Sequence, residues 1–316
     1  MIGFFNLSLA LELWRAGAEL HDLLSIEGMT ALLMPLVPSL LVLELIFAIA
    51  TRRTDLRASY KVPALTFLFN RWTAGLLAFD VIATCENVLW PYALWHCSFT
   101  WYGFLYSYLV WELGHYIYHY TCHRIRLLWC FHATHHAPER MNLSVIHVGF
   151  FLQGLHANLV RSSFCVLLGV DLGLLAVVMV LDAFWGGFVH VSDELLKDGR
   201  LGILHKFMLT PSHHRVHHAR NPLYRDKNYC NTLMLWDWLF GTLQAELPGV
   251  KPEYGLIRSV NSESFMDVQF SEVAMLMKDV WTAPRYMDKL RYALMPPGWQ
   301  PGGREMWVPN PSSEDR

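Results

Sequence analysis

Residues 112–136 read ELGHYIYHYTCHRIRLLWCFHATHH and contain two histidine motifs, HxxxH at 119–123 and HxxHH at 132–136. A second HxxHH motif, HRVHH, follows at residues 214–218. On a helix, positions i, i+3 and i+4 lie on one face, so HxxxH presents two imidazoles together and HxxHH presents three. A structural zinc site needs about four ligands. The eight imidazoles therefore indicate a site for two metal ions.

The composition is that of a membrane protein. Hydrophobic residues make up 53% of the 316-residue chain and charged residues only 16%, whereas soluble domains have about 25% charged residues. The aromatic content of 14% fits side chains that gather at membrane interfaces. The net charge of -2 gives no reason to expect a nucleic-acid partner. The six cysteines have no CxxC spacing, which favours reduced, apolar side chains.

Hydropathy and charge predict an all-α, multi-pass integral membrane domain of about four to five spans. The candidate spans are residues 31–50, 72–95, 98–118, 145–168 and 172–191, each near the roughly 20 residues that cross a bilayer. Residues 51–71 carry five basic side chains against one acid and are expected to form a cytoplasmic loop. The spans that end at residues 118 and 191 then bring the motif at 119–123 and the isolated His190 to the cytoplasmic face.

We expect three regions along the chain. Residues 1–30 should form an interfacial helix without a cleaved signal peptide. Residues 31–191 should form the transmembrane domain with the first histidine motifs. Residues 192–316 should form a cytosolic, histidine-rich helical cap with the last motif, helices near 262–282 and 284–295, and a Pro/Gly-rich tail. The favoured location is the bacterial inner membrane, with the endoplasmic reticulum as the alternative and the active site on the cytoplasmic face.

The chemistry that this donor set favours is O2 activation by two iron ions. Neutral imidazole binds zinc, copper, iron and nickel, and two metal ions can share the electrons that O2 reduction requires. We expect a hydroxyl group to be inserted into an unactivated C–H bond of a membrane lipid. A desaturase that uses the same metal ions is the alternative. Zinc can replace iron in purified protein.

Two other classes of protein compete with this hypothesis. A bis-histidine haem protein would place paired histidines deep inside facing spans and needs no HxxHH motif. A metal transporter would place its ligands near the membrane midplane, between broken helices. The histidines of this chain are predicted at the ends of spans, which disfavours both classes.

Several further side chains are candidates for roles around the metal ions. Glu112 precedes His119 by about two helical turns and is expected to accept a hydrogen bond from a ligand imidazole. Buried acids such as Asp182 are expected to pair with other groups or line the substrate cavity. His115 and His213 are weaker candidate ligands than the motif histidines. Supporting or structural positions are expected for His147, His156 and His205.

At these motifs the chain resembles the fatty acid hydroxylase superfamily, also called the sterol desaturase family. The family's acid, glycine, aromatic and HRxxH pattern is echoed at 112–123, with Tyr120 in place of the arginine. The block at 210–242, with TPSHHRVHHARN, DKNY and WDWLFGT, is highly specific. It is most similar to the alkylglycerol monooxygenase branch with its bacterial members, as is the tail with YGLI and PPGWQPG.

The resemblance implies a four-helix-type membrane domain, a di-metal centre and O2-dependent hydroxylation or desaturation of a lipid. It assigns nine metal ligands by position: His119, His123, His132, His135, His136, His190, His214, His217 and His218. Some relatives have a further histidine where this chain has Glu194, which could ligate metal instead. Because the chain has no GxGxxG, CxxCH or ferredoxin-type cysteine motif, a separate redox partner is expected. The resemblance implies a reduced pterin as the external electron donor.

Overall fold

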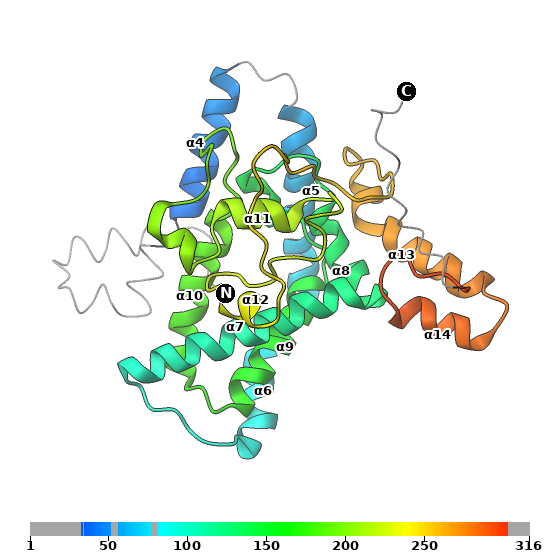
Figure 1. Cartoon of the computed structure of the whole chain (residues 1–316). Helices are drawn as coiled ribbons and strands as arrows, with labels where there is room; N and C mark the ends of the chain where they lie inside the picture. The colour runs from blue at the N-terminus through cyan, green and yellow to red at the C-terminus, as the bar shows by residue number, and fades with distance from the viewer. Residues whose placement is uncertain (1–32, 34, 52–55, 78–80, 303–316) are drawn as a thin grey trace.

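The computed structural model describes residues 33, 35–51, 56–77 and 81–302 (Figure 1). Over these residues the chain forms α-helices, short 3-10 helices and one isolated β-bridge between Met208 and Leu233. The predicted all-α class is confirmed. The helix expected over residues 1–30 lies outside the described residues. No helix in the described ranges is both long enough and apolar enough to cross a bilayer.

The first half of the chain supplies most of the long helices. In order they are α4 (Leu36–Ala50), α5 (Leu56–Leu77), α6 (Val81–Leu89), α7 (Trp101–Arg124), α8 (Arg126–His136), α9 (Gln153–Leu167) and α10 (Leu172–Phe188). The second half contributes α11 (Pro211–His218), α12 (Leu235–Leu239), α13 (Phe265–Thr282) and α14 (Tyr286–Leu294). The 3-10 helices are η1 (Trp90–Tyr92), η2 (Leu143–His147) and η3 (Gly202–Lys206).

Helix α7 is the central element of the fold. It starts where the Thr100 side chain accepts a hydrogen bond from the N–H of Gly103 at 3.1 Å, which satisfies one of the free amides of the first turn. It then packs against α8, α9 and α10. Its buried Trp111 lies in an apolar core with Cys165 of α9 and Val178 of α10. The last turn of α7 therefore has a fixed position at the centre of the molecule.

A glycine sets the close approach of α7 and α9. A Cβ atom added at Gly114 would lie 3.3 Å from the Cα atom of Arg161 on α9, so a larger residue would push the two helices apart. This approach brings the Arg161 side chain beside His115, one turn before His119. The ELGH sequence of α7 thus determines which polar groups face the histidine motifs.

The predicted loop over residues 51–71 is wrong, because α5 is helical from Leu56 to Leu77. Basic residues mark a preferred side of a membrane but do not prevent a helix, since Lys and Arg are good helix formers. The adjoining stretch at 72–95 is divided between the end of α5, the short α6 and η1. From Trp90 onward this stretch is no longer α-helical.

The other expected segments are helical with shifted ends. Helix α7 extends beyond residue 118 to Arg124, so His119 and His123 lie on the helix itself. The stretch at 145–168 is α-helical only from Gln153, after the end of the 3-10 helix η2, and α10 covers residues 172–188 of the expected 172–191. The two helices expected near 262–282 and 284–295 are confirmed as α13 and α14. The boundaries between regions at residues 30 and 191 stay predictions.

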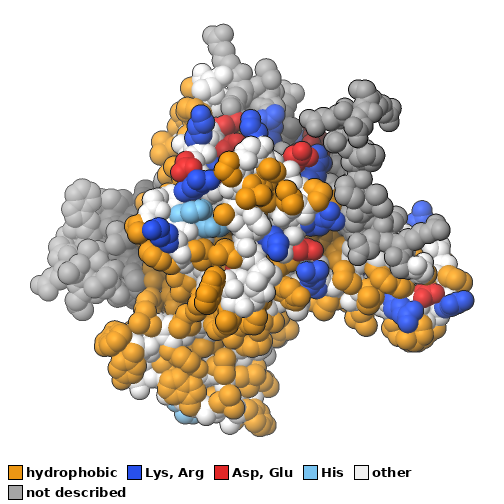
Figure 2. Space-filling model, in the orientation of Figure 1, with side chains coloured by type: hydrophobic (Ala, Val, Ile, Leu, Met, Phe, Trp, Pro, Cys, Tyr) orange, Lys and Arg blue, Asp and Glu red, His pale blue; other side chains and the backbone are white. Residues whose placement is uncertain are grey.

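The surface divides into an apolar part and a charged part. Figure 2 shows hydrophobic side chains covering the lower part of the view, around α6 and the start of α7, with charged side chains mainly above them. The exposed residues at this lower end include Leu94, Phe99 and Trp101, which are 78%, 66% and 75% exposed. Such a contiguous apolar surface is typical of a face that contacts another apolar phase.

Candidate metal centre

The structure brings all nine predicted histidines together around the last turn of α7. His119 and His123 lie on α7, three histidines lie on α8, three on α11, and His190 follows the end of α10. They form two groups that could each hold a metal ion, with ligand atoms within 4.8 Å of one another. The first group contains His119, His123, His132, His136 and His217. The second contains His135, His190, His214 and His218.

Each HxxHH motif is divided between the two groups, so the expectation that its three imidazoles act on one side is wrong. On α8, His132 and His136 belong to the group of five, while His135 belongs to the group of four. On α11 the division is reversed: His214 and His218 belong to the group of four, while His217 belongs to the group of five. Adjacent helical residues point about 100° apart, which sends neighbouring imidazoles to different sites.

The two groups adjoin one another. The ring centroids of His136 and His218, one from each group, are 4.6 Å apart, and those of His217 and His218, also one from each group, are 5.4 Å apart. Since both α8 and α11 contribute to both groups, neither group can move without the other. The donor set is therefore one rigid block with two adjacent positions for metal ions.

The imidazole tautomers in the group of four leave lone pairs directed at one another. The Nδ1–H of His190 donates to the Gly186 carbonyl at 2.7 Å, and that of His135 donates to the Val148 carbonyl at 3.0 Å. Their Nε2 atoms are then both acceptors, yet they lie 3.2 Å apart. Two acceptors at this separation repel each other unless a cation lies between them. This geometry fits a metal ion.

Two ligands of the group of five are oriented by one backbone turn. The Nδ1–H of His119 donates to the Tyr229 carbonyl and that of His217 to the Lys227 carbonyl, both at 2.8 Å. The buried carboxylate of Asp237 holds this turn by accepting the N–H groups of Tyr229 and Cys230 at 2.7 and 2.8 Å. Such support fixes the tautomer and orientation of metal-ligating histidines.

His123 has a carboxylate partner instead. Its Nδ1 lies 3.4 Å from Oδ1 of Asp226, and Oδ2 of the same carboxylate lies 3.6 Å from Nη1 of Arg124. The Nε2 atoms of His123 and His217 are buried and have no hydrogen-bond partner in the part of the chain that the structure describes. Buried polar atoms are nearly always paired, so these two atoms are the second observation that fits a metal ion.

Burial keeps the imidazoles neutral. Loss of hydration lowers the pKa of His119, His136 and His217 well below 6.5, and the neighbouring histidines lower it further. For His135 burial lowers the pKa to about 4. Because only neutral imidazole has a free lone pair for metal, these side chains can ligate at neutral pH without first losing a proton.

Glu112 and Glu194 occupy other positions than those expected. The Glu112 carboxylate accepts the N–H groups of Asn231 and Thr232 at 3.2 and 2.9 Å, so its contacts are with the backbone beyond the 227–230 turn. Glu112 thus supports the backbone that follows the Tyr229 carbonyl. Glu194 belongs to neither histidine group and lines a separate cavity with Glu44.

The remaining histidines lie around the two groups. The ring of His115 is 5.4 Å from that of His119, and His156 Nδ1 is 3.8 Å from Cys122. His213 caps the start of α11 through Thr210 and stacks on His205 with ring centroids 4.1 Å apart. None of them belongs to either histidine group.

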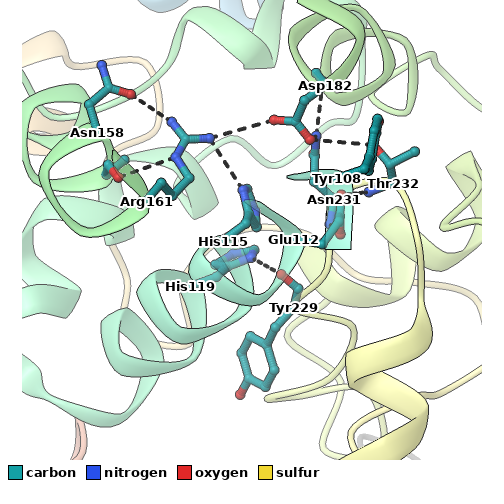
Figure 3. A network of polar contacts seen from close by, with 11 residues as sticks. Tyr108, Glu112, His115, His119, Asn158, Arg161, Asp182, Tyr229, Asn231 and Thr232 are labelled. Atoms are coloured by element: carbon teal, nitrogen blue, oxygen red, sulfur yellow. Dashed lines mark hydrogen bonds and ion pairs between the residues drawn. The ribbon is translucent and has the colours of Figure 1, made fainter. Parts of the chain in front are cut away.

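A polar network lies beside His119 (Figure 3) and shares a cavity with His135 and His190 of the group of four. Arg161 is at its centre, with Nη1 3.7 Å from the Asp182 carboxylate and 3.4 Å from His115 Nδ1. Its Nη2 donates to Asn158 at 3.0 Å, and its guanidinium lies 4.5 Å from the Trp111 ring. Asp182 also accepts from Asn231 at 2.6 Å. The network confirms that Asp182 is paired.

Two cavities reach the histidine groups from different sides. One, of about 480 Å³, is lined by His135 and His190 and by apolar side chains such as Met179 and Phe184, together with Arg161. The other, of about 270 Å³, touches the group of five and is lined on one side by Pro296, Pro297 and Trp299. The larger cavity has room for part of an alkyl chain beside the group of four.

The sequence reasoning missed the residues that support the ligands. Asp226 and Asp237 lie within the DKNY and WDWLFGT motifs, which had served only to mark a resemblance. The amide of Gln153 lies 3.0 Å from Nδ1 of His132, but no sequence motif points to this residue. The signal that could have identified the two aspartates is that both carboxylates follow the last histidine motif within the same specific block at 210–242.

Comparison with known proteins agrees with the motifs. The family model of fatty acid hydroxylases matches residues 104–242, which contain all nine histidines. Alkylglycerol monooxygenase from Homo sapiens is 33% identical over 208 residues, covering 66% of this chain and 44% of that protein. The Xenopus tropicalis protein of the same name is 30% identical over 277 residues, covering 85% and 59%.

A bacterial relative extends the comparison. Ornithine lipid hydroxylase OlsE from Rhizobium tropici is 33% identical over 133 residues, covering 42% of this chain and 38% of that protein. The chain spans about half the length of the curated relatives it matches. No solved structure matches it. The resemblance to the fatty acid hydroxylase superfamily is confirmed over residues 104–242, which the family model matches.

Proposed function

We propose that this protein is an O2-dependent di-iron hydroxylase that inserts a hydroxyl group into an unactivated C–H bond of an alkyl or acyl chain of a membrane lipid. The observation that carries the proposal is the pair of adjoining all-histidine groups, with an apolar cavity at the group of four. The names of the relatives, which act on alkylglycerol and ornithine lipid, support a lipid substrate.

Nine histidines would hold the two iron ions, five on one and four on the other. Iron bound there would supply O2 reduction and removal of hydrogen from the substrate. Zinc, which also accepts imidazole ligands, would be expected to replace iron in part during purification. The carbonyls and carboxylates behind the rings would keep the Nε2 lone pairs directed at the metal positions.

The protein's own contribution is to place the lipid. The cavity beside His135 and His190 would take the chain, with Met179 and Phe184 excluding water around it. Arg161 and Asn158 lie in the same cavity and would contact a polar part of the substrate. A desaturase remains the alternative, because hydrogen abstraction begins both reactions.

The redox partner and location belong to the same proposal. A separate electron donor would serve the enzyme, with a reduced pterin as the candidate implied by the alkylglycerol monooxygenase relatives. We further propose a multi-pass protein of the bacterial inner membrane with its histidines on the cytoplasmic face. The apolar composition and the apolar lower surface support contact with a membrane.

The test combines metal analysis with lipid analysis. We expect about two iron ions per gently purified chain, and a lipid species heavier by one oxygen in expressing cells. A species lighter by two hydrogens would indicate the desaturase. One metal ion or none in folded protein would contradict the site, and a haem absorbance band would favour the haem alternative.

Single substitutions distinguish the two metal positions. His190→Ala should lower the amount of metal bound by the group of four. His217→Ala should lower the amount of metal bound by the group of five. Both variants should lose activity. The exposed His96, whose ring packs at a tilt against Trp90, provides a control: His96→Ala should change neither metal content nor activity. Unchanged metal content in both variants would refute the ligand assignment.

A further inference from the structure

Helices α13 and α14 form a helical hairpin, here called the C-terminal arm (residues 265–295), that extends sideways from the body in Figure 1. It is attached to α8 through Arg126, which is only 4% exposed. The guanidinium of Arg126 pairs with Asp279 at 2.5 Å and lies 5.6 Å from the Tyr292 ring. Its backbone N–H donates to the Met295 carbonyl at 3.0 Å. The base of the arm is therefore fixed.

The outer face of the arm is apolar and uncovered. Trp281, at 86%, is the most exposed large hydrophobic side chain that the structure describes. Met277 lies one turn before it on α13 and is 66% exposed. On α14 the residues Tyr286, Leu290 and Leu294 are spaced four apart and form a single exposed stripe. A Trp and a Tyr at the turn between two helices are typical of a membrane interface.

The charges exposed on the arm are mainly basic. Of its four acids only Asp267, in the first turn of α13, is exposed. Asp279 pairs with Arg126, Glu272 pairs with Arg258, and Asp288 is only 5% exposed. Over the described residues, no ion pair joins Lys278, Arg285 or Lys289 to a carboxylate. Figure 2 shows hydrophobic side chains on the arm as well as on the lower body, with Lys and Arg at the arm's tip.

We propose that the C-terminal arm lies in the interface of an anionic lipid bilayer, with Trp281 and Tyr286 at headgroup depth. Apolar side chains with flanking bases bind such interfaces through buried area and attraction to anionic lipids. The basic side chains on the arm favour an anionic bilayer over a protein partner. A protein would need an acidic patch shaped to fit both α13 and α14. The proposal does not depend on the metal centre or on the reaction.

The experiment uses a fluorophore at the tip of the arm. All six native cysteines are buried, so a cysteine introduced by Tyr286→Cys can be labelled selectively with a polarity-sensitive dye. The full-length protein is reconstituted into vesicles of phosphatidylcholine alone or with phosphatidylglycerol, with and without shallow brominated lipid. We expect a blue shift and quenching that increase with the phosphatidylglycerol fraction. A cysteine at the exposed Lys251, outside the arm, should show neither effect.

Charge substitutions provide the second measurement. In the labelled protein, K278Q/K289Q should abolish most of the dependence on phosphatidylglycerol, whereas K206Q/K251Q, which removes two lysines outside the arm, should preserve it. A dye at residue 286 that stays water-exposed in both kinds of vesicle would overturn the proposal. So would a blue shift without lipid quenching that depends on protein concentration, because that result indicates a second copy of the chain on the arm.

Discussion

The carboxylate of Asp237 holds the N–H of Tyr229 at 2.7 Å, and the carbonyl of Tyr229 in turn orients His119 at 2.8 Å. One buried acid thus controls a candidate metal ligand through the main chain. The same turn also orients His217 through the Lys227 carbonyl. Two ligands of the group of five therefore depend on a residue that touches neither of them.

The first prediction concerns this support. In Asp237→Asn one carboxylate oxygen becomes an N–H donor facing a backbone N–H, so the 227–230 turn should loosen. Loss of a group that orients a ligand typically lowers metal affinity about 10- to 100-fold. Competition with a chromophoric chelator measures the change. The exposed Asp267→Asn is the matched control, and equal affinities of the two variants would contradict the assignment.

A second prediction separates support from ligation at Glu112. Its carboxylate accepts two backbone N–H groups, so Glu112→Gln should leave one of them unsatisfied at a cost of about 1–3 kcal/mol. We expect a lower Tm, with full metal content when iron is saturating. Loss of metal at unchanged Tm would instead indicate the direct contact with an imidazole that the sequence predicted.

The third prediction concerns the buried pair of Arg161 and Asp182. Arg161→Gln leaves the Asp182 charge buried without its cation, which should destabilise the protein by about 3–5 kcal/mol. The double variant R161Q/D182N should recover part of this loss, because no buried charge then remains unpaired. Thermal unfolding of the single and double variants measures the coupling. Strictly additive effects would show that the two residues do not stabilise each other.

The fourth prediction tests the larger cavity. Ala183 lines it beside His190, so Ala183→Trp should fill space that the lipid chain needs. Lipid hydroxylation should fall strongly while the metal content stays unchanged, since the substituted side chain is not a ligand. Ala245→Trp, in an exposed loop, is the control for adding a bulky side chain. Full activity of the cavity variant would place the substrate elsewhere.

Much of the centre could be predicted from local spacing. HxxxH and HxxHH are periodic features of a helix, and the helices α7, α8 and α11 carry them as expected. The ends of helices were less predictable where the positions of charged residues had been used to assign membrane topology. Arg71 and Lys61 marked a loop in the sequence, yet they lie within α5, because charge does not determine backbone conformation.

The sequence by itself determined which side chains can ligate metal, that the fold is helical and that the chain resembles the fatty acid hydroxylases, since each follows from residue type and local spacing. Only the tertiary structure decided which histidines of other helices share a group with His135 and which with His136, and that Asp237 acts through the Tyr229 carbonyl. The physical reason is that helical spacing fixes the direction of a side chain around its own axis. The neighbour it meets depends on how distant helices pack.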